Sequence, residues 1–320
     1  MVGAVTETPA PVGYGARPVS VQLIRGRTLT QASDRPVPGR VVVAPPIPAR
    51  DPNAADRLSL KHWPRGHRIL VCSLTGGTGR TTIAALIAVT LAGQPYAAHW
   101  PAALLVDGDP RRFDPAWPPH IDRSELAPGA FGSQVCRQST PAGYEVLHLC
   151  DPGRGLRRWD VSSAAVAAVE NNYGPVIIDN PCGLPSESLW TRTTGCSVVL
   201  VVRADRDSLT TAAQALVWMH DRHQVSKHQV IVVVNRGVGA RTGRFIAAAS
   251  ALAIRCHGLH QLPAHPGLGP GLTPPYARPV PDRLRLRLAQ ICLDIWHTTQ
   301  TTDTDRDARP DRADQPQENR

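Results

Sequence analysis

Lysine is almost absent from this sequence. Of its 35 basic residues only Lys61 and Lys227 are lysines, so the formal net charge of +9 comes almost entirely from arginine. Chains that are rich in arginine, alanine and proline but poor in lysine are typical of GC-rich genomes. The positive charge is therefore weak evidence for nucleic-acid binding. Lysine and arginine are not interchangeable where the geometry of a contact matters.

Two further absences narrow the class of protein. The seven cysteines are odd in number and scattered, and they include no Cys-x-x-Cys pair, which argues against a disulfide framework and favours reduced core thiols. The sequence does not open with a charged segment followed by an apolar stretch, and no apolar run approaches the ~20 residues that a membrane-spanning helix needs. We therefore expect a soluble, cytoplasmic protein.

Composition divides the chain into three regions. Residues 1–65 are dense in proline, so we expect a disordered leader, with a proline-rich docking segment for a protein partner as the alternative. Residues 66–297 alternate apolar runs with helical patterns and are expected to form one domain. Residues 298–320 are polar and mixed in charge, which predicts a disordered tail and offers no amphipathic helix for membrane attachment.

The middle region has the pattern of an α/β domain. Strands are predicted at 68–73, 103–106, 145–149, 175–179, 197–203 and 229–235, with a short one at 253–256. Helices are predicted at 80–91, 160–171, 208–222, 242–251 and 282–297, while 107–142 is expected to contain little regular structure. Continuous apolar strands that alternate with helices predict a doubly wound, mostly parallel sheet with helices on both faces.

The segment after the first predicted strand has the composition of a phosphate-binding loop. It reads Thr-Gly-Gly-Thr-Gly-Arg-Thr-Thr at 75–82. Gly76, Gly77 and Gly79 let the backbone turn tightly, so that successive N–H groups can point at phosphate oxygens. The N-terminus of the next helix faces the same anion. Arg80, however, stands where such a loop carries the lysine that reaches the β- and γ-phosphates.

Carboxylates end two of the other predicted strands. Asp107 and Asp109 follow the strand in Leu-Leu-Val-Asp-Gly-Asp-Pro at 104–110, and Asp179 ends the strand in Val-Ile-Ile-Asp-Asn-Pro-Cys-Gly at 176–183. Ligands of doubly wound sheets bind at the carboxyl ends of the strands, so these acids are expected beside the loop, where they can hold Mg²⁺ together with the Thr81 hydroxyl. The alternative is that they only cap adjoining turns.

Together these segments resemble the MinD/ParA class of P-loop ATPases. The loop at 75–82 corresponds to the family's Lys-Gly-Gly-x-Gly-Lys-Thr-Thr, and the two acidic strand ends correspond to its switch regions. The segments 198–212 and 232–236, and the Leu-Pro at 262–263, extend the resemblance, which covers roughly residues 67 to 297.

The resemblance implies a role for each matching residue. ATP or ADP would be held by Thr75, Gly76, Gly77, Thr78, Gly79, Arg80, Thr81 and Thr82. Mg²⁺ would be held by Thr81, Asp109 and Asp179, and Asp109 would position the catalytic water beside the charge of Arg80. Asn235 would contact the adenine edge, although an asparagine that ends a strand is as readily a turn former. Pro263 would pack near the base.

Both lysines that the family carries in this loop are missing. Thr75 replaces the lysine that reaches the nucleotide of the partner subunit, and Arg80 replaces the lysine of the phosphate-binding loop. Loss of a charge contributed by a partner subunit can cost on the order of 10³–10⁵ in rate. We therefore expect nucleotide binding to persist, with a nucleotide-driven homodimer disfavoured and ATP hydrolysis slow or absent.

The main hypothesis is a nucleotide-dependent regulatory or positioning factor. One alternative is an active partition-type ATPase that binds DNA non-specifically, for which Arg283, Arg285 and Arg287 are candidate contacts. The other is a pseudo-ATPase scaffold that binds no nucleotide. A metal site in the string Cys256, His257, His260 and His265 is disfavoured, because its spacing follows no standard zinc pattern.

Overall fold

The computed structural model describes residues 51–93, 103–107, 135–140, 142–149, 172–180, 183, 196–236, 249, 252–263, 280 and 282–307. Its centre is an eight-stranded sheet with the order β3-β4-β2-β5-β1-β6-β7-β8. The strands are β1 Arg68–Cys72, β2 Leu104–Asp107, β3 Val135–Ser139, β4 Glu145–Leu149, β5 Val176–Asp179, β6 Ser197–Arg203, β7 Val230–Asn235 and β8 Gly258–Leu262.

Neighbouring strands are parallel except at one edge. Only the pairing of β3 with β4 is antiparallel, and every other pair in the sheet is parallel. Since parallel neighbours need crossover connections that place helices on the sheet faces, this topology confirms the predicted doubly wound fold.

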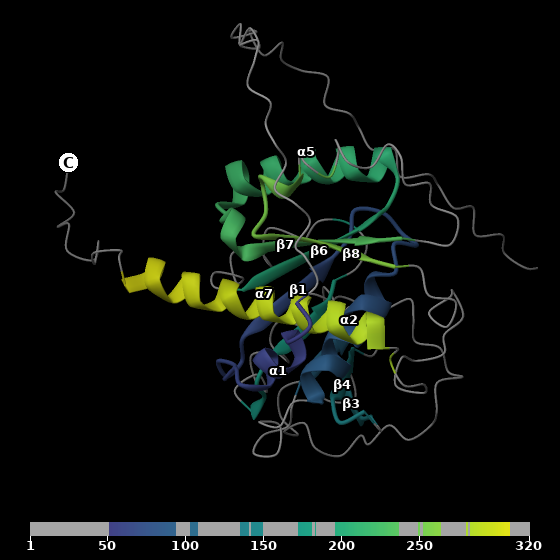
Figure 1. Cartoon of the computed structure of the whole chain (residues 1–320), viewed down its shortest axis with the longest axis vertical. Coiled ribbons are helices and arrows are strands. Elements are labelled where there is room, and N and C mark those ends of the chain that lie inside the picture. Colours follow the sequence, from purple (N-terminus) through teal and green to yellow (C-terminus); the bar gives the residue numbers. More distant parts are fainter. Residues whose placement is uncertain are drawn as a thin grey trace, which may run out of the picture. The chain divides into compact units, whose positions relative to one another are not determined.

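Helices cover both faces of the sheet (Figure 1). The helical elements are α1 Ala54–Ser59, α2 Arg80–Ala92, α5 Arg206–His223, the short 3₁₀ helix η5 Lys227–Gln229, and α7 Asp282–Asp307. Helix α5 packs on one face, and α1, α2 and α7 pack on the other.

The side chains of β1 show how the two layers arise from one strand. Leu70 and Cys72 belong to the core beneath α5, whereas Ile69 and Val71 belong to the core beneath α2 and α7. All four are fully buried. Successive side chains of a strand point to opposite faces, so a strand covered on both faces must be apolar throughout, which is the pattern the sequence shows.

Two strands differ from the sequence-based prediction. Strand β3 lies inside 107–142, where we expected little regular structure, and it pairs with β4 along its whole length. The last strand lies at Gly258–Leu262 and not at 253–256, because Leu252 and Ala253 are helical. A four-residue segment such as Ala-Ile-Arg-Cys fits the end of a helix as well as a short strand, so periodicity could not separate them.

The folded unit also extends past both predicted boundaries. Helix α1 lies within 1–65, where we expected a disordered leader, and buries Ala54 and Leu58 completely. Helix α7 continues to Asp307, and Thr298 and Thr299 are only 1% and 2% exposed. Short amphipathic ends of this kind are ordered by tertiary packing, which composition cannot reveal. The rest of the expected leader and tail, and the predicted helix 160–171, lie outside the described residues.

Candidate functional site

The loop between β1 and α2 has the backbone of an anion-binding turn. Gly77 and Gly79 have φ values of +72° and +81°, in the left-handed region that glycine adopts without strain. Gly79 is also the N-cap of α2 and provides no side-chain cap, so the first N–H groups of the helix have no side-chain acceptor at that position. Thr75, Gly76 and Gly77 are exposed, which leaves the outer side of the loop accessible.

The end of β5 is hydrogen-bonded to the residues of β1 that lead into this loop. The register pairs Val71 with Asp179, so the carboxyl end of β5 lies directly beside the point where β1 enters the loop. The Asn180 N–H donates to the Val71 carbonyl at 2.9 Å, and the Gly183 N–H donates to the Ser73 carbonyl at 2.8 Å. The predicted convergence of the glycine-rich loop and the Asp179 strand end is therefore present.

Arg80 does not extend toward solvent. Its Nε lies 2.5 Å from Oδ1 of Asp179, and the two side chains are 6% and 1% exposed. The Thr81 hydroxyl donates to the other carboxylate oxygen of Asp179, also at 2.5 Å. One buried carboxylate thus binds the two consecutive residues that open α2, and we call this arrangement the Arg80–Asp179–Thr81 cluster.

Asn235, the last residue of β7, is hydrogen-bonded to the loop. Its Nδ2 donates to the carbonyl oxygen of Thr78 at 2.8 Å, and Thr78 is only 3% exposed. A Cβ built on Gly79 would lie 2.5 Å from the same Nδ2, so this close approach requires glycine. Pro263 follows directly after Leu262, which pairs with Asn235, so both residues lie at the carboxyl edge of the sheet. Contacts of Asn235 and Pro263 with adenine remain predictions.

The second acidic segment is described only as far as Asp107. This residue ends β2 and pairs in register with Asp179, so its backbone lies at the same edge of the sheet. Asp109, the predicted catalytic and metal-binding residue, lies outside the described residues.

Mg²⁺, which the fold class implies, fits the donor types but not their arrangement. The hydroxyl of Thr81 and the carboxylate of Asp179 are oxygen donors of the kind that Mg²⁺ prefers. Here, however, the hydroxyl donates to Oδ2 of the carboxylate, and the guanidinium Nε contacts Oδ1. The cation that neutralises Asp179 is therefore part of the chain itself.

A buried thiol underlies the loop. Burial raises the pKa of Cys72 to about 12, although the positive charge of Arg80 acts in the opposite direction. The thiol is therefore neutral at physiological pH and behaves as an apolar core group. Cys72, Cys256 and Cys292 are free thiols, and they are buried together with Cys196.

The histidine string near β8 has a structural explanation. His260 Nε2 lies 2.8 Å from Oδ2 of Asp294 on α7, and the Cys256 thiol donates to the Leu252 carbonyl. Within the described part of the chain no group of three or more His, Cys, Asp or Glu side chains could hold a metal ion. His265 lies outside that part.

The candidate DNA contacts on α7 differ in exposure. Arg283 and Arg285 are exposed, Arg287 is partly buried, and Arg285 lies 3.2 Å from the carboxylate of Asp282 in an i,i+3 pair. An exposed pair of this kind contributes little energy and leaves most of the guanidinium in solvent. The exposure of Arg283 and Arg285 is that of a solvated helix face.

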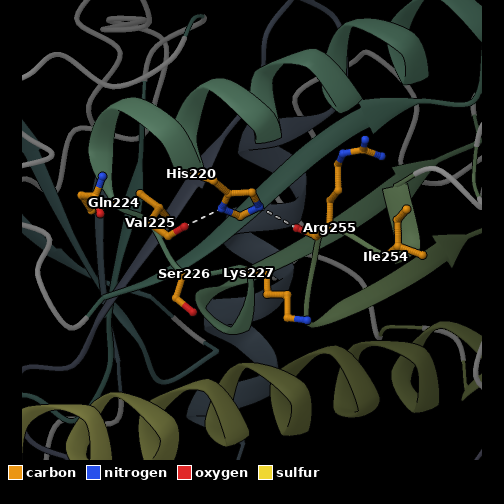
Figure 2. Close-up of a pocket in the computed structure, with 7 residues that line it drawn as sticks. All are labelled: His220, Gln224, Val225, Ser226, Lys227, Ile254 and Arg255. Atoms are coloured by element: carbon orange, nitrogen blue, oxygen red, sulfur yellow. Dashed lines mark hydrogen bonds between the residues drawn. The ribbon is translucent and has the colours of Figure 1, made fainter. Parts of the chain in front are cut away.

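A pocket of about 380 Å³ lies at the opposite edge of the sheet. It is formed where α5 ends and η5 precedes β7, which is the amino-terminal edge of the strands. Figure 2 shows the His220 ring between the carbonyls of Val225 and Arg255. Its Nδ1 lies 2.5 Å from the Val225 oxygen, and its Nε2 lies 3.0 Å from the Arg255 oxygen. These contacts tie the end of α5 to the segment before β8, so His220 has a structural role away from the loop.

Comparison with known proteins identifies the fold. A ParA family ATPase from Chlorobium tepidum superposes with a TM-score of 0.50 at 17% sequence identity, over 71% of this chain and 99% of that chain. The MinD cell division protein of Aquifex aeolicus gives 0.47 at 18% identity over 71% and 96% of the two chains. The Pyrococcus furiosus cell division ATPase MinD gives 0.45 at 21% identity over 70% and 97%.

No protein-family model matches the sequence, and no curated protein is significantly similar to it. The match to the ParA family ATPase therefore defines the fold: the chain has the architecture of the MinD/ParA P-loop ATPases. In the described residues no helix is both long enough and apolar enough to cross a membrane.

Sequence analysis did not identify Asp179 as the partner of Arg80. The signal was present, because an arginine opened the helix after the loop and an aspartate ended another strand at the same edge. Their pairing could have been proposed once β5 was placed next to β1, and that adjacency is a property of the tertiary structure.

Proposed function

We propose that this protein is a MinD/ParA-like factor that binds ATP or ADP and changes its affinity for a partner with the state of the nucleotide. Hydrolysis is slow or absent. The observation that carries the proposal is the Arg80–Asp179–Thr81 cluster beside an accessible glycine-rich loop. The loop supports binding of an anionic phosphate group, and the buried ion pair keeps the one cationic side chain of the loop on the carboxylate.

The loop supplies groups that suit the phosphates of a nucleotide. The N–H groups of the loop and the first turn of α2 provide donors, and the helix dipole favours negative charge at the same place. The left-handed glycines hold the turn open, and Asn235 fixes the position of Thr78. Asn235 and Pro263 lie at the same sheet edge, where we propose that the adenine ring binds.

The same residues argue for slow chemistry. Fast phosphoryl transfer needs positive charge at the oxygens where negative charge develops. Thr75 has no charge, and the Nε of Arg80 is held 2.5 Å from a buried carboxylate. We propose that Asp109 positions any attacking water, and that the remaining activity is too weak to drive rapid cycling.

The proposed binding of a partner protein depends on the proline-rich segment that precedes α1. The proline-rich stretch before α1 is the segment that we propose as a protein-docking tether in the cytoplasm. A homodimer is a secondary expectation, because Thr75 lacks the charge of a lysine that would reach into a second subunit. DNA binding is a secondary expectation as well.

Calorimetric titration of the full chain with ATP and ADP tests the proposal. We expect dissociation constants in the micromolar range, which correspond to about −8 kcal/mol, and phosphate release near the level of a protein-free blank. Rapid ATP turnover together with salt-sensitive DNA binding would instead favour the partition-type ATPase. No heat and no thermal stabilisation by either nucleotide would leave the pseudo-ATPase scaffold.

A further inference from the structure

We infer that this site takes its nucleotide without a divalent cation, because Arg80 supplies to Asp179 the positive charge that a metal ion would supply. The inference rests on the proposed function and concerns the same site. It follows from the geometry of three side chains, Arg80, Thr81 and Asp179.

The first step is the charge of Asp179. A carboxylate that is only 1% exposed is costly to bury unless a cation or several hydrogen bonds compensate it. Arg80 is itself 6% exposed and lies against Oδ1, so the two buried charges neutralise each other within the chain. A metal ion entering here would have to displace the guanidinium and leave it as a buried cation without this carboxylate.

The second step is the distance between the two oxygen donors. The Thr81 hydroxyl lies 2.5 Å from Oδ2 of Asp179. Two oxygens at adjacent corners of a Mg²⁺ octahedron, each ~2.1 Å from the ion, are roughly 3 Å apart. The two oxygens are therefore closer than two adjacent ligands of one ion, and direct coordination by both would have to separate them. The Thr81 oxygen keeps its lone pairs while it donates its hydrogen, so the contact between Arg80 and Asp179 is what opposes a metal at the carboxylate.

The third step is that the anion-binding side of the site does not depend on the metal. The positive-φ glycines Gly77 and Gly79 shape the loop, and its exposed residues Thr75, Gly76 and Gly77 keep its outer side open. Backbone N–H groups in a loop and at a helix N-terminus attract phosphate with or without Mg²⁺. The site thus keeps its groups for phosphate, while the carboxylate expected to hold the metal is already paired with Arg80.

The test is calorimetry of the full chain with ATP and with ADP, in buffer containing excess Mg²⁺ and in buffer containing excess EDTA. For the native protein we expect the two dissociation constants to agree within about threefold. Thermal melts with nucleotide in EDTA should show the same stabilisation as melts in Mg²⁺.

The decisive variant is Arg80→Lys. A lysine carries one compact ammonium in place of the planar fork of arginine, so we expect it to leave the carboxylate of Asp179 available to a metal. We expect Mg²⁺ to tighten ATP binding to this variant by at least about tenfold relative to EDTA. Arg203→Lys is the matched control, because Arg203 ends the neighbouring strand β6 with an exposed side chain. It should show the ratio of the native protein.

A second variant covers the case in which Arg80→Lys does not fold. Thr81→Ala retains the pair between Arg80 and Asp179 and is expected to weaken ATP binding equally in the two buffers. A loss confined to the Mg²⁺ buffer would mark Thr81 as a metal ligand and overturn the inference.

Each remaining outcome separates the two proposals. Native protein that binds nucleotide only with Mg²⁺ would overturn the inference and leave the proposed function intact. Native protein that binds no nucleotide in either buffer would remove both.

Discussion

Arg80 Nε and Asp179 Oδ1 lie 2.5 Å apart, in a pair whose side chains are 6% and 1% exposed. Arg80 opens the helix after the glycine-rich loop, and Asp179 ends the adjacent strand, so the pair joins two parts of the chain that are 99 residues apart. One of the two residues that replace the loop lysines is thus also a structural link between α2 and β5. We therefore expect a substitution at this position to change stability as well as the proposed nucleotide binding.

Replacing Asp179 by alanine should strongly destabilise the protein. The change leaves the Arg80 guanidinium buried without its carboxylate, and removing one partner of a buried pair typically costs about 3–5 kcal/mol. Urea unfolding of the full chain measures the free energy. The double variant Arg80→Met with Asp179→Leu should lose much less, because no buried charge remains.

A matched control for that prediction is Asp205→Ala. Asp205 caps α5 by accepting a hydrogen bond from the Ser208 N–H at 2.8 Å, and loss of such a cap costs about 0.5–2 kcal/mol. If Asp179→Ala costs no more than this control, Arg80 has an alternative partner and the pair is not the link described above.

Gly79→Ala should be more harmful in the native background than beside Asn235→Ala. The new Cβ would lie 2.5 Å from the Asn235 amide nitrogen, and φ at this residue is +81°. The left-handed conformation alone costs about 1–2 kcal/mol for a non-glycine residue. Asn235→Ala removes the clash but not the backbone strain.

The double-mutant cycle for Gly79 and Asn235 can be measured by thermal unfolding and by ATP titration. We expect a coupling of at least about 1 kcal/mol, with the double variant less destabilised than the sum of the two single variants. Strict additivity would mean that the loop relaxes away from Asn235, so that the hydrogen bond to Thr78 does not fix it.

Stability should fall between neutral and mildly acidic pH because of His67. Burial lowers the pKa of His67 from 6.5 to about 4, and its Nε2 lies 2.8 Å from the Ser197 hydroxyl. Below pH 6.5 the unfolded chain takes up a proton that the folded chain does not, so the free energy of unfolding falls as the pH is lowered toward 4. The full effect is about 3 kcal/mol.

His67→Gln tests this assignment, because glutamine stays neutral and can still contact the Ser197 hydroxyl. Urea unfolding at a series of pH values should give a flatter profile for the variant. A residual slope is expected, since burial also lowers the pKa values of His257 and His297. Identical slopes for the two proteins would show that His67 is protonated without cost in the folded state.

Ending the chain after His297 should destabilise it, whereas ending it after Asp307 should not. Thr298 is 1% exposed, donates to the Ile295 carbonyl at 2.6 Å, and is hydrogen-bonded to the Ser197 hydroxyl of β6. Removing Thr298 exposes the Ser197 hydroxyl and the end of α7 to water. Thermal melts of the two truncated chains and the full chain measure the effect. Equal melting temperatures for all three would contradict a structural role for residues 298–307.

The fold was predictable because its signals are local. Short apolar runs such as 68–72 and 230–235 predict strands covered on both faces, and the glycines at 76, 77 and 79 predict the turn from sequence alone. Strand β3 and helix α1 were missed for the opposite reason. Each is short, and each is stabilised by a neighbour, β4 or α7, that lies elsewhere in the chain.

The sequence by itself determined the class of fold, the phosphate-type loop and the replacement of both loop lysines, because these depend on residue type and order along the chain. Only the tertiary structure decided what the replacements do. Strand β5 is placed beside β1, so Asp179 meets Arg80 and Thr81, and Asn235 on β7 meets Thr78. Such pairings depend on strand order and side-chain distance, which residue type alone does not encode.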